Sequence, residues 1–182
     1  MKVAILALQG AFAEHAQMLR RLGVDSFLVR GRRDWDRHKD ALIIPGGEST
    51  AMMRIIRDES LLVPVRDSIM SGLPVFGTCA GLIMLDDSHL GTMAIEVRRN
   101  AYGRQSGSFR TIGEFAGVGT VPMTFIRAPY IAKVRDGAEA LSVVDGHIVA
   151  ARQGRQVVTA FHPELDDDVR IHEFFLSLIR GM

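Results

Sequence analysis

The sequence has a single cysteine, no surplus of charge of either sign and no long hydrophobic run. Cys79 stands alone among 182 residues, so no disulfide can form within the chain, and a free thiol agrees with a reducing cytoplasm. Lysine and arginine total 22 against 21 aspartate and glutamate, which gives no support for binding nucleic acid or an anionic membrane surface. No apolar run approaches the roughly 20 residues of a membrane-spanning helix, and the apolar N-terminus is too short for a signal peptide. We therefore expect a cytoplasmic globular protein with one domain, residues 1–182.

Strand-like and helix-like segments alternate through the first half of the chain. Continuous apolar runs predict buried strands at residues 3–8, 26–29, 41–44 and 75–76, and helical spacing of apolar residues predicts helices at 12–22, from 52 onward and at 61–70. This alternation implies right-handed crossovers and a parallel, doubly wound sheet. Residues 30–40, which include Trp35, are expected to form a solvated, charged connection with a marginal helix.

The second half has a different pattern. Frequent glycines between residues 102 and 120 indicate loops and hairpins, residues 121–127 predict a strand, and 147–151 and 156–161 predict the two arms of a hairpin. Asp166–Asp168 offer caps for a last helix with an apolar stripe. The predicted fold class is α/β: a single-domain, flavodoxin-like three-layer sandwich with a mixed, mostly parallel central sheet and antiparallel additions in the second half.

Cys79 lies between a short apolar run and the start of a helical pattern, with Gly77 and Gly81 on either side. This arrangement predicts a nucleophile elbow, in which a sharp strand-to-helix turn presents the side chain and glycines allow neighbouring backbone to come close. The first helical turn would favour a thiolate. The alternative is an inert core thiol, which is the commoner role of a lone cysteine.

Two other segments are candidates for the same site. The predicted strand at 41–44 ends in the turn Gly46-Gly47, and ligands gather at the carboxyl ends of strands in such sheets. His162, fixed by Pro163, follows the late strand, and Glu164 would share its face if the extended conformation continued. Of the other histidines, His15, His38 and His172 are expected at the surface or at an interface.

These segments together are suited to acyl transfer. The Cys79 thiolate would attack a carbonyl group, with His162 as the proton carrier and Glu164 orienting the imidazole. Backbone N–H groups of Gly47 and Ala80 would bind the oxyanion.

The same residues carry a family resemblance. The blocks at residues 45–50, 77–81 and 161–164 resemble the signatures of class I, triad-type glutamine amidotransferases. Residues 8–10, 46–50, 99–105 and 125–129 are more closely similar to the glutaminase subunit of pyridoxal 5′-phosphate synthase.

The resemblance implies hydrolysis of L-glutamine to glutamate and ammonia, which a tunnel carries to a separate synthase subunit for pyridoxal phosphate (vitamin B6) synthesis. Catalysis would use Cys79, His162 and Glu164 through a thioester, with no cofactor and no metal. The resemblance also implies substrate-binding positions, which are Gly47, Glu48, Ser49, Arg99, Ile126 and Arg127. The family assembles with the synthase in a double ring of twelve copies of each subunit, for which residues 8–10 and the following helix are candidate contacts.

Two alternatives stay open at this stage. One is a glutaminase that serves another synthase, or a related cysteine-elbow hydrolase; residues 99–105 and 125–129 argue against it. The other is a non-catalytic module of the same fold, which predicts a broken triad, whereas all three residues are present. One departure from the family is a short link, Asp86-Asp87-Ser88, before His89.

Overall fold

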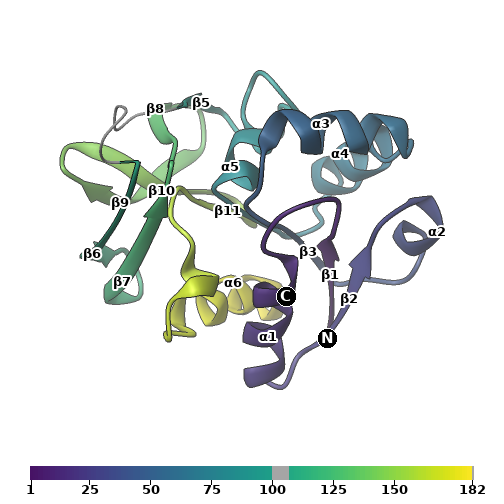
Figure 1. Cartoon of the computed structure of the whole chain (residues 1–182), viewed down its shortest axis with the longest axis horizontal. Coiled ribbons are helices and arrows are strands. Elements are labelled where there is room, and N and C mark those ends of the chain that lie inside the picture. The colour runs from purple at the N-terminus through teal and green to yellow at the C-terminus, as the bar shows by residue number, and fades with distance from the viewer. Residues whose placement is uncertain (100–106, 182) are drawn as a thin grey trace.

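The computed structural model describes residues 1–99 and 107–181, which form a central sheet covered by helices (Figure 1). The strands of the sheet run in the order β2 (Asp25–Val29), β1 (Lys2–Leu6), β3 (Ala41–Ile44), β4 (Val75–Thr78), β11 (Gln156–Thr159), β10 (His147–Gln153), β8 (Tyr130–Val134) and β5 (Ile95–Arg98), with β9 (Ala138–Val144) paired to β10. Pairing is parallel from β2 through β11 and antiparallel beyond it. The predicted fold class is thereby confirmed.

Helices cover both faces of the parallel part of the sheet. Figure 1 shows α1 (Phe12–Arg21) and α6 (Arg170–Arg180) on one face and α3 (Ser49–Asp58), α4 (Leu62–Met70) and α5 (Ala80–Leu85) on the other, with the short α2 (Arg32–Trp35) beside β2. The strands between them are buried on both sides, which explains their continuous apolar sequences.

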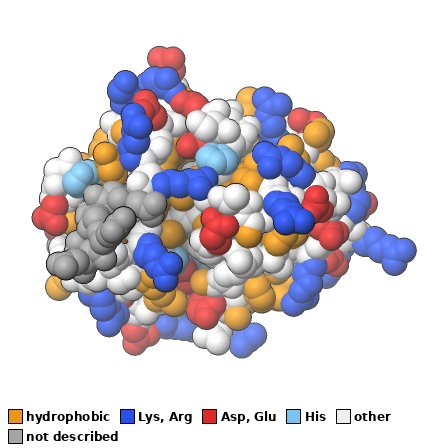
Figure 2. Space-filling model, turned by 45° about the horizontal axis from the view of Figure 1, so that its top comes forward, with side chains coloured by type: hydrophobic (Ala, Val, Ile, Leu, Met, Phe, Trp, Pro, Cys, Tyr) orange, Lys and Arg blue, Asp and Glu red, His pale blue; other side chains and the backbone are white. Residues whose placement is uncertain are grey.

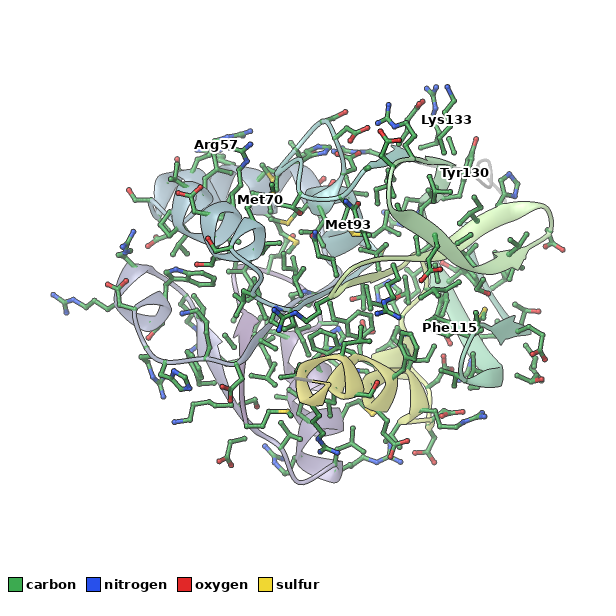
Figure 3. The ribbon with its side chains drawn as sticks, turned by 180° about the vertical axis from the view of Figure 1, so that it is seen from behind. Arg57, Met70, Met93, Phe115, Tyr130 and Lys133 are labelled. Atoms are coloured by element: carbon green, nitrogen blue, oxygen red, sulfur yellow. The ribbon has the colours of Figure 1, made fainter. Side chains whose placement is uncertain are left out.

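A two-stranded ribbon of β6 (Ser108–Phe115) and β7 (Gly119–Ile126) extends from this core. Burial alternates along both strands, as expected of a ribbon with one face packed and one in solvent. Phe115, labelled in Figure 3, packs edge-on against Phe174 of α6 with ring centroids 5.4 Å apart. The ribbon agrees with the hairpins expected between residues 102 and 120 and the strand expected at 121–127, and the arms predicted at 147–151 and 156–161 pair as β10 and β11. Residues 100–106 lie outside the described part of the chain.

Several local expectations were wrong. Trp35 is 4% exposed rather than part of a solvated connection, because its ring packs at the edge of the core beside β2. The Lys39 ammonium lies 4.1 Å from the centroid of this ring, in a cation–π contact. The first strand ends at Leu6 and the late strand at Thr159, each two residues early. Asp168 does accept the Arg170 N–H at 3.0 Å, although the residue before α6 is Val169.

The surface is mixed in charge. On the face shown in Figure 2, basic and acidic side chains are interspersed with apolar ones. In the described part of the chain, no helix is both long enough and apolar enough to span a bilayer.

A substitution at Gly81 tests the close packing of the elbow against β3. A Cβ at this position would overlap the carbonyl oxygen of Ile44 in β3, so we expect Gly81→Ala to lower the free energy of unfolding by about 1–3 kcal/mol. Gly181→Ala is the matched control, since its backbone φ of −71° suits alanine and its Cβ would lie 3.6 Å from the nearest atom. Denaturant unfolding of both variants measures the difference; equal stabilities would contradict the close approach.

Candidate active site

The elbow at Cys79 has the backbone geometry of a presented nucleophile. Cys79 links β4 to α5 with φ 49° and ψ −100°, a conformation that costs a non-glycine residue about 1–3 kcal/mol. Its N–H is held by the Thr159 carbonyl at 2.8 Å, which ties the elbow to the end of β11. A Cβ on Gly77 would lie 2.7 Å from the Gly81 carbonyl oxygen, so both flanking glycines allow close backbone contact, as expected.

The glycine turn after β3 lies against this elbow. A Cβ on Gly46 would collide with Cε1 of His162 and lie 3.4 Å from the Cβ of Cys79. The backbone of Gly46 therefore packs closely against both the His162 imidazole and Cys79, and a larger residue at position 46 would push these two side chains apart. The turn brings the carboxyl ends of β3, β4 and β11 to one place.

His162 and Glu164 form a buried pair. His162 Nδ1 and Glu164 Oε1 are 2.7 Å apart, and the carboxylate side chain is 0% exposed. The extended conformation expected here was wrong: Pro163–Leu165 form a short 3-10 helix (η1), in which the Leu165 N–H reaches the His162 carbonyl at 3.2 Å. Proline starts this turn because its φ is fixed and it donates no N–H.

The loop that carries His162 is fixed from the ribbon. The His162 N–H donates to the Thr124 carbonyl at 2.8 Å. Asp166, just after η1, accepts from the Thr124 hydroxyl at 2.8 Å and from Arg110 at 2.7 Å. The ribbon thus holds the loop after β11 in one position over the end of the sheet.

The surroundings of His162 stabilise its charged form. Burial disfavours the imidazolium, but the interactions with Cys79 and then with Glu164 outweigh that effect and raise the pKa of His162 to about 10. The ring is therefore protonated at neutral pH and places a positive charge beside the Cys79 sulfur.

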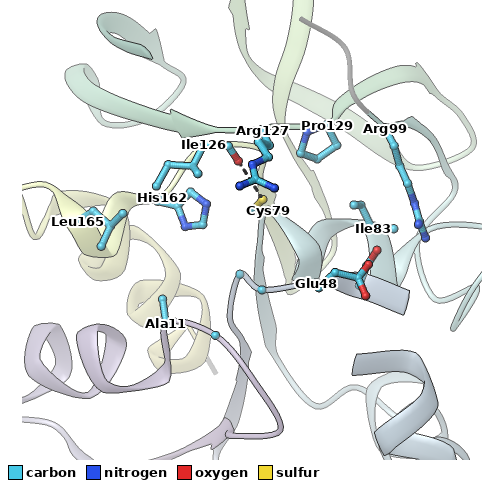
Figure 4. Close-up of a pocket in the computed structure, with 14 residues that line it drawn as sticks. Ala11, Glu48, Cys79, Ile83, Arg99, Ile126, Arg127, Pro129, His162 and Leu165 are labelled. Carbon is cyan, nitrogen blue, oxygen red and sulfur yellow. Dashed lines mark hydrogen bonds between the residues drawn. The ribbon is translucent and has the colours of Figure 1, made fainter. Parts of the chain in front are cut away.

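These groups open into a cleft of about 540 Å³ (Figure 4). Eight of the residues proposed from sequence line it, which are Gly47, Glu48, Ser49, Cys79, Arg99, Ile126, Arg127 and His162. Glu164 lies behind His162 rather than in the lining, and Ala80 is not a lining residue, although as the first residue of α5 it has an N–H without an intrahelical acceptor. The other lining residues are Gly10, Ala11, Gly46, Ile83, Pro129 and Leu165. Gly46 was expected in the glycine turn, and Gly10 and Pro129 lie in the blocks that carry the resemblance, whereas Ala11, Ile83 and Leu165 were missed.

Glu48 has a structural role in addition to lining the cleft. Its carboxylate caps α3 by accepting the N–H groups of Thr50 at 3.0 Å and Ala51 at 2.7 Å, and these bonds lower the pKa of Glu48. Its own N–H donates to the Gln9 side-chain oxygen at 2.8 Å. The residue 8–10 block therefore supports the glycine turn directly.

Arg99 is held at the mouth of the cleft by the short link that follows α5. Its guanidinium lies 3.1 Å from His89 Nε2 and donates to the Thr50 hydroxyl at 3.2 Å. The other ring nitrogen of His89 is 2.6 Å from Asp86, which also accepts the Ser88 N–H at 2.9 Å. Hydrogen bonds among Asp86, Ser88 and His89 thus hold this segment in a compact turn, and His89 in turn supports Arg99.

The opposite wall comes from the end of β7. The Ile126 carbonyl oxygen lies 3.9 Å from the Cys79 sulfur. Arg127 has a positive φ of 43° and its N–H donates to the Gly107 carbonyl. This turn in the backbone sends the Arg127 side chain into the cleft (Figure 4).

Two histidines expected at the surface are buried instead. His15 and His172 are both 0% exposed, because each lies on the inward face of its helix. Helical spacing in the sequence could have predicted this burial. His15 is three and four residues from Met18 and Leu19, and His172 is three and four residues from Phe175 and Leu176, all of which are buried. The expectation was wrong because both histidines were treated as polar surface residues rather than as part of the apolar face of each helix.

The titration of His162 tests the electrostatics of the site. In ring NMR spectra of the intact protein we expect His162 to stay protonated through neutral pH, with a midpoint near its pKa of about 10. The midpoint should fall in Cys79→Ala, which loses the hydrogen bond and the charge interaction with Cys79 that help to raise it. His172, whose burial lowers its pKa to about 3, is the internal control and should stay neutral. A His162 midpoint near 6.5 would contradict the ion-pair geometry.

Sequence comparison identifies close relatives over nearly the whole chain. Residues 5–180 match the model of the SNO glutamine amidotransferase family. The pyridoxal 5′-phosphate synthase subunit PdxT of Streptococcus pneumoniae, in strains D39 and R6, is 53% identical over 190 aligned residues, covering 99% of this chain and 98% of that protein.

Solved structures with a similar fold agree with this family assignment. A crystal structure of a glutamine amidotransferase superimposes with a TM-score of 0.91 at 40% identity and covers 98% of both chains. A glutamine amidotransferase from Thermotoga maritima shares the fold, with a TM-score of 0.67 at 12% identity over 99% of this chain and 84% of that one. The chain belongs to the SNO glutamine amidotransferase family.

Proposed function

We propose that this protein hydrolyses L-glutamine to L-glutamate and ammonia and supplies the ammonia to a pyridoxal 5′-phosphate synthase partner. The observation that carries the proposal is that Cys79 and His162 line one cleft while the Glu164 carboxylate lies behind His162, with 2.7 Å between Oε1 and Nδ1. The 53% identity to PdxT, a subunit of pyridoxal 5′-phosphate synthase, supports the assignment of the ammonia to this pathway.

In the first half-reaction the Cys79 sulfur attacks the side-chain carbonyl carbon of glutamine. The carbonyl oxygen becomes an oxyanion, for which the N–H groups of Gly47 and Ala80 are the candidate donors. As the C–N bond breaks, His162 gives its proton to the departing nitrogen, which leaves as ammonia. A γ-glutamyl thioester on Cys79 and a neutral His162 remain.

In the second half-reaction water resolves the thioester. Neutral His162 takes a proton from the water as its oxygen attacks the thioester carbon, and the C–S bond then breaks. Glutamate leaves, and the thiolate and the imidazolium are restored. Glu164 faces His162 Nδ1, so it fixes the ring so that Nε2 carries the proton being exchanged.

The remaining lining residues are suited to the amino-acid end of glutamine. Arg99 and Arg127 supply cations for the α-carboxylate, and Glu48 supplies an acceptor for the α-ammonium. Gly47, Ser49 and Ile126 complete the wall beside Cys79. The fixed contacts of Glu48 and Arg99 hold these charges in place before the substrate arrives.

Delivery of ammonia requires a docked synthase. The assembly of twelve copies of each subunit, implied by the resemblance, is part of this proposal. Activation on docking is also part of this proposal: without the synthase, the isolated protein would be a poor glutaminase. Assays therefore use the complex with the purified synthase.

Replacing the nucleophile tests the proposal. Cys79→Ala in complex with the synthase should abolish glutamate release from L-glutamine, because no thioester can form. Ammonium chloride in place of glutamine should still support pyridoxal phosphate formation, which controls for intact assembly. Glutamate release at the wild-type rate from Cys79→Ala would contradict the mechanism, and failure of ammonium to rescue would contradict the role as ammonia donor.

A further inference from the structure

A buried polar cluster lies directly behind the catalytic carboxylate. It joins His15 of α1, His172 of α6 and Thr78 of β4, all 0% exposed. His15 Nδ1 is 2.9 Å from His172 Nε2, and His15 Nε2 is 3.1 Å from the Thr78 hydroxyl. Both imidazoles pack edge-on against Phe76, which shares a face of β4 with Thr78. The proposed mechanism uses none of these groups.

The cluster touches the triad at the second oxygen of Glu164. Oε1 of Glu164 is paired with His162, whereas Oε2, among the described residues, has no hydrogen-bond partner. A buried carboxylate oxygen without a donor is costly. The His15 Nε2 atom lies 3.5 Å from this oxygen, and both side chains are 0% exposed.

His15 is neutral, so the position of its single ring proton matters. Burial, and then the charges of His172 and His162, lower the pKa of His15 well below its usual value. The 3.5 Å contact is therefore not an ion pair. With the proton on Nε2, His15 donates to the Thr78 hydroxyl, 3.1 Å away, and the same nitrogen lies 3.5 Å from Glu164 Oε2. With the proton on Nδ1, it would direct a lone pair at a carboxylate.

His172 favours the first tautomer. When His15 Nδ1 has no proton, it accepts from Nε2–H of His172, 2.9 Å away. His172 then leaves only the lone pair of its Nδ1 unpartnered, which matches the described contacts. The opposite arrangement would leave a buried N–H without an acceptor.

We propose that His15 is a positioning residue for the active site: its Nε2–H, shared between Thr78 and Glu164 Oε2, holds the carboxylate with Oε1 toward His162, and His172 fixes the tautomer of His15. This inference rests on the proposed glutaminase function. Because Thr78 directly precedes Cys79, the same N–H also ties the nucleophile strand to the carboxylate that serves its base.

A double-mutant cycle tests the role. His15→Leu removes the donor at similar volume, and His15→Gln keeps a neutral amide N–H near the position of Nε2. Both are made in the wild type and in Glu164→Gln, and glutamate release from L-glutamine is measured in complex with the synthase. We expect His15→Leu to lower kcat on the order of tenfold with KM within about twofold, and His15→Gln to recover most of the loss.

In the Glu164→Gln background, His15→Leu should lower kcat by no more than about twofold, because the carboxylate through which it acts is gone. An equal loss in both backgrounds, a wild-type kcat in His15→Leu, or no recovery in His15→Gln would overturn the proposal. A wild-type complex that releases no glutamate would overturn the proposed function instead.

Ring NMR of the wild-type protein tests the tautomer, and a variant is needed only to assign the signals. Nitrogen-15 spectra should show the proton of His15, and that of His172, on Nε2 at neutral pH, with His15 signals assigned by their loss in His15→Gln. A proton on His15 Nδ1 would overturn the proposal, because the ring could then donate nothing to Glu164.

Discussion

The parallel pairing of β4 between β3 and β11 fixes the positions of the proposed reacting groups. Ile44, the last residue of β3, pairs with Gly77 of β4, and Thr159, the last residue of β11, pairs with Thr78. Each strand therefore ends at the same level, and the glycine turn, Cys79 and the His162 loop leave the sheet side by side. Gly77 and Gly81 have no room for a Cβ because β3 and β4 meet α5 there, and Gly46 has none because His162 packs against it.

The strain at Cys79 is supported by contacts from several elements. The residue keeps its positive φ because its N–H bonds to Thr159 and because α5 packs against β3 and β4. The His162 loop is fixed in turn by Thr124 and by Asp166. Chemistry at the proposed site therefore depends on contacts that come from both halves of the chain, including the ribbon of β6 and β7.

Local patterns in the sequence predicted the fold, the Cys79 elbow and the glycine turn, whereas the substrate-binding positions were implied by the family resemblance. Buried parallel strands leave continuous apolar runs, and a glycine-flanked cysteine marks a sharp turn. The turn at Pro163 was missed because alternation assumes a continuing strand, whereas η1 forms instead. Helical spacing could have predicted the burial of His15 and His172, but their mutual contact joins residues 157 apart in the sequence, and no local pattern predicts it.

The central claim is that Cys79 carries a covalent γ-glutamyl group during turnover. Hydroxylamine competes with water for such a thioester, so partitioning of the product measures it directly. We predict that the wild-type complex, given L-glutamine and rising hydroxylamine, will form γ-glutamyl hydroxamate at the expense of glutamate, and that Cys79→Ala will form neither. Undiminished glutamate release with no hydroxamate at any hydroxylamine concentration would contradict the account.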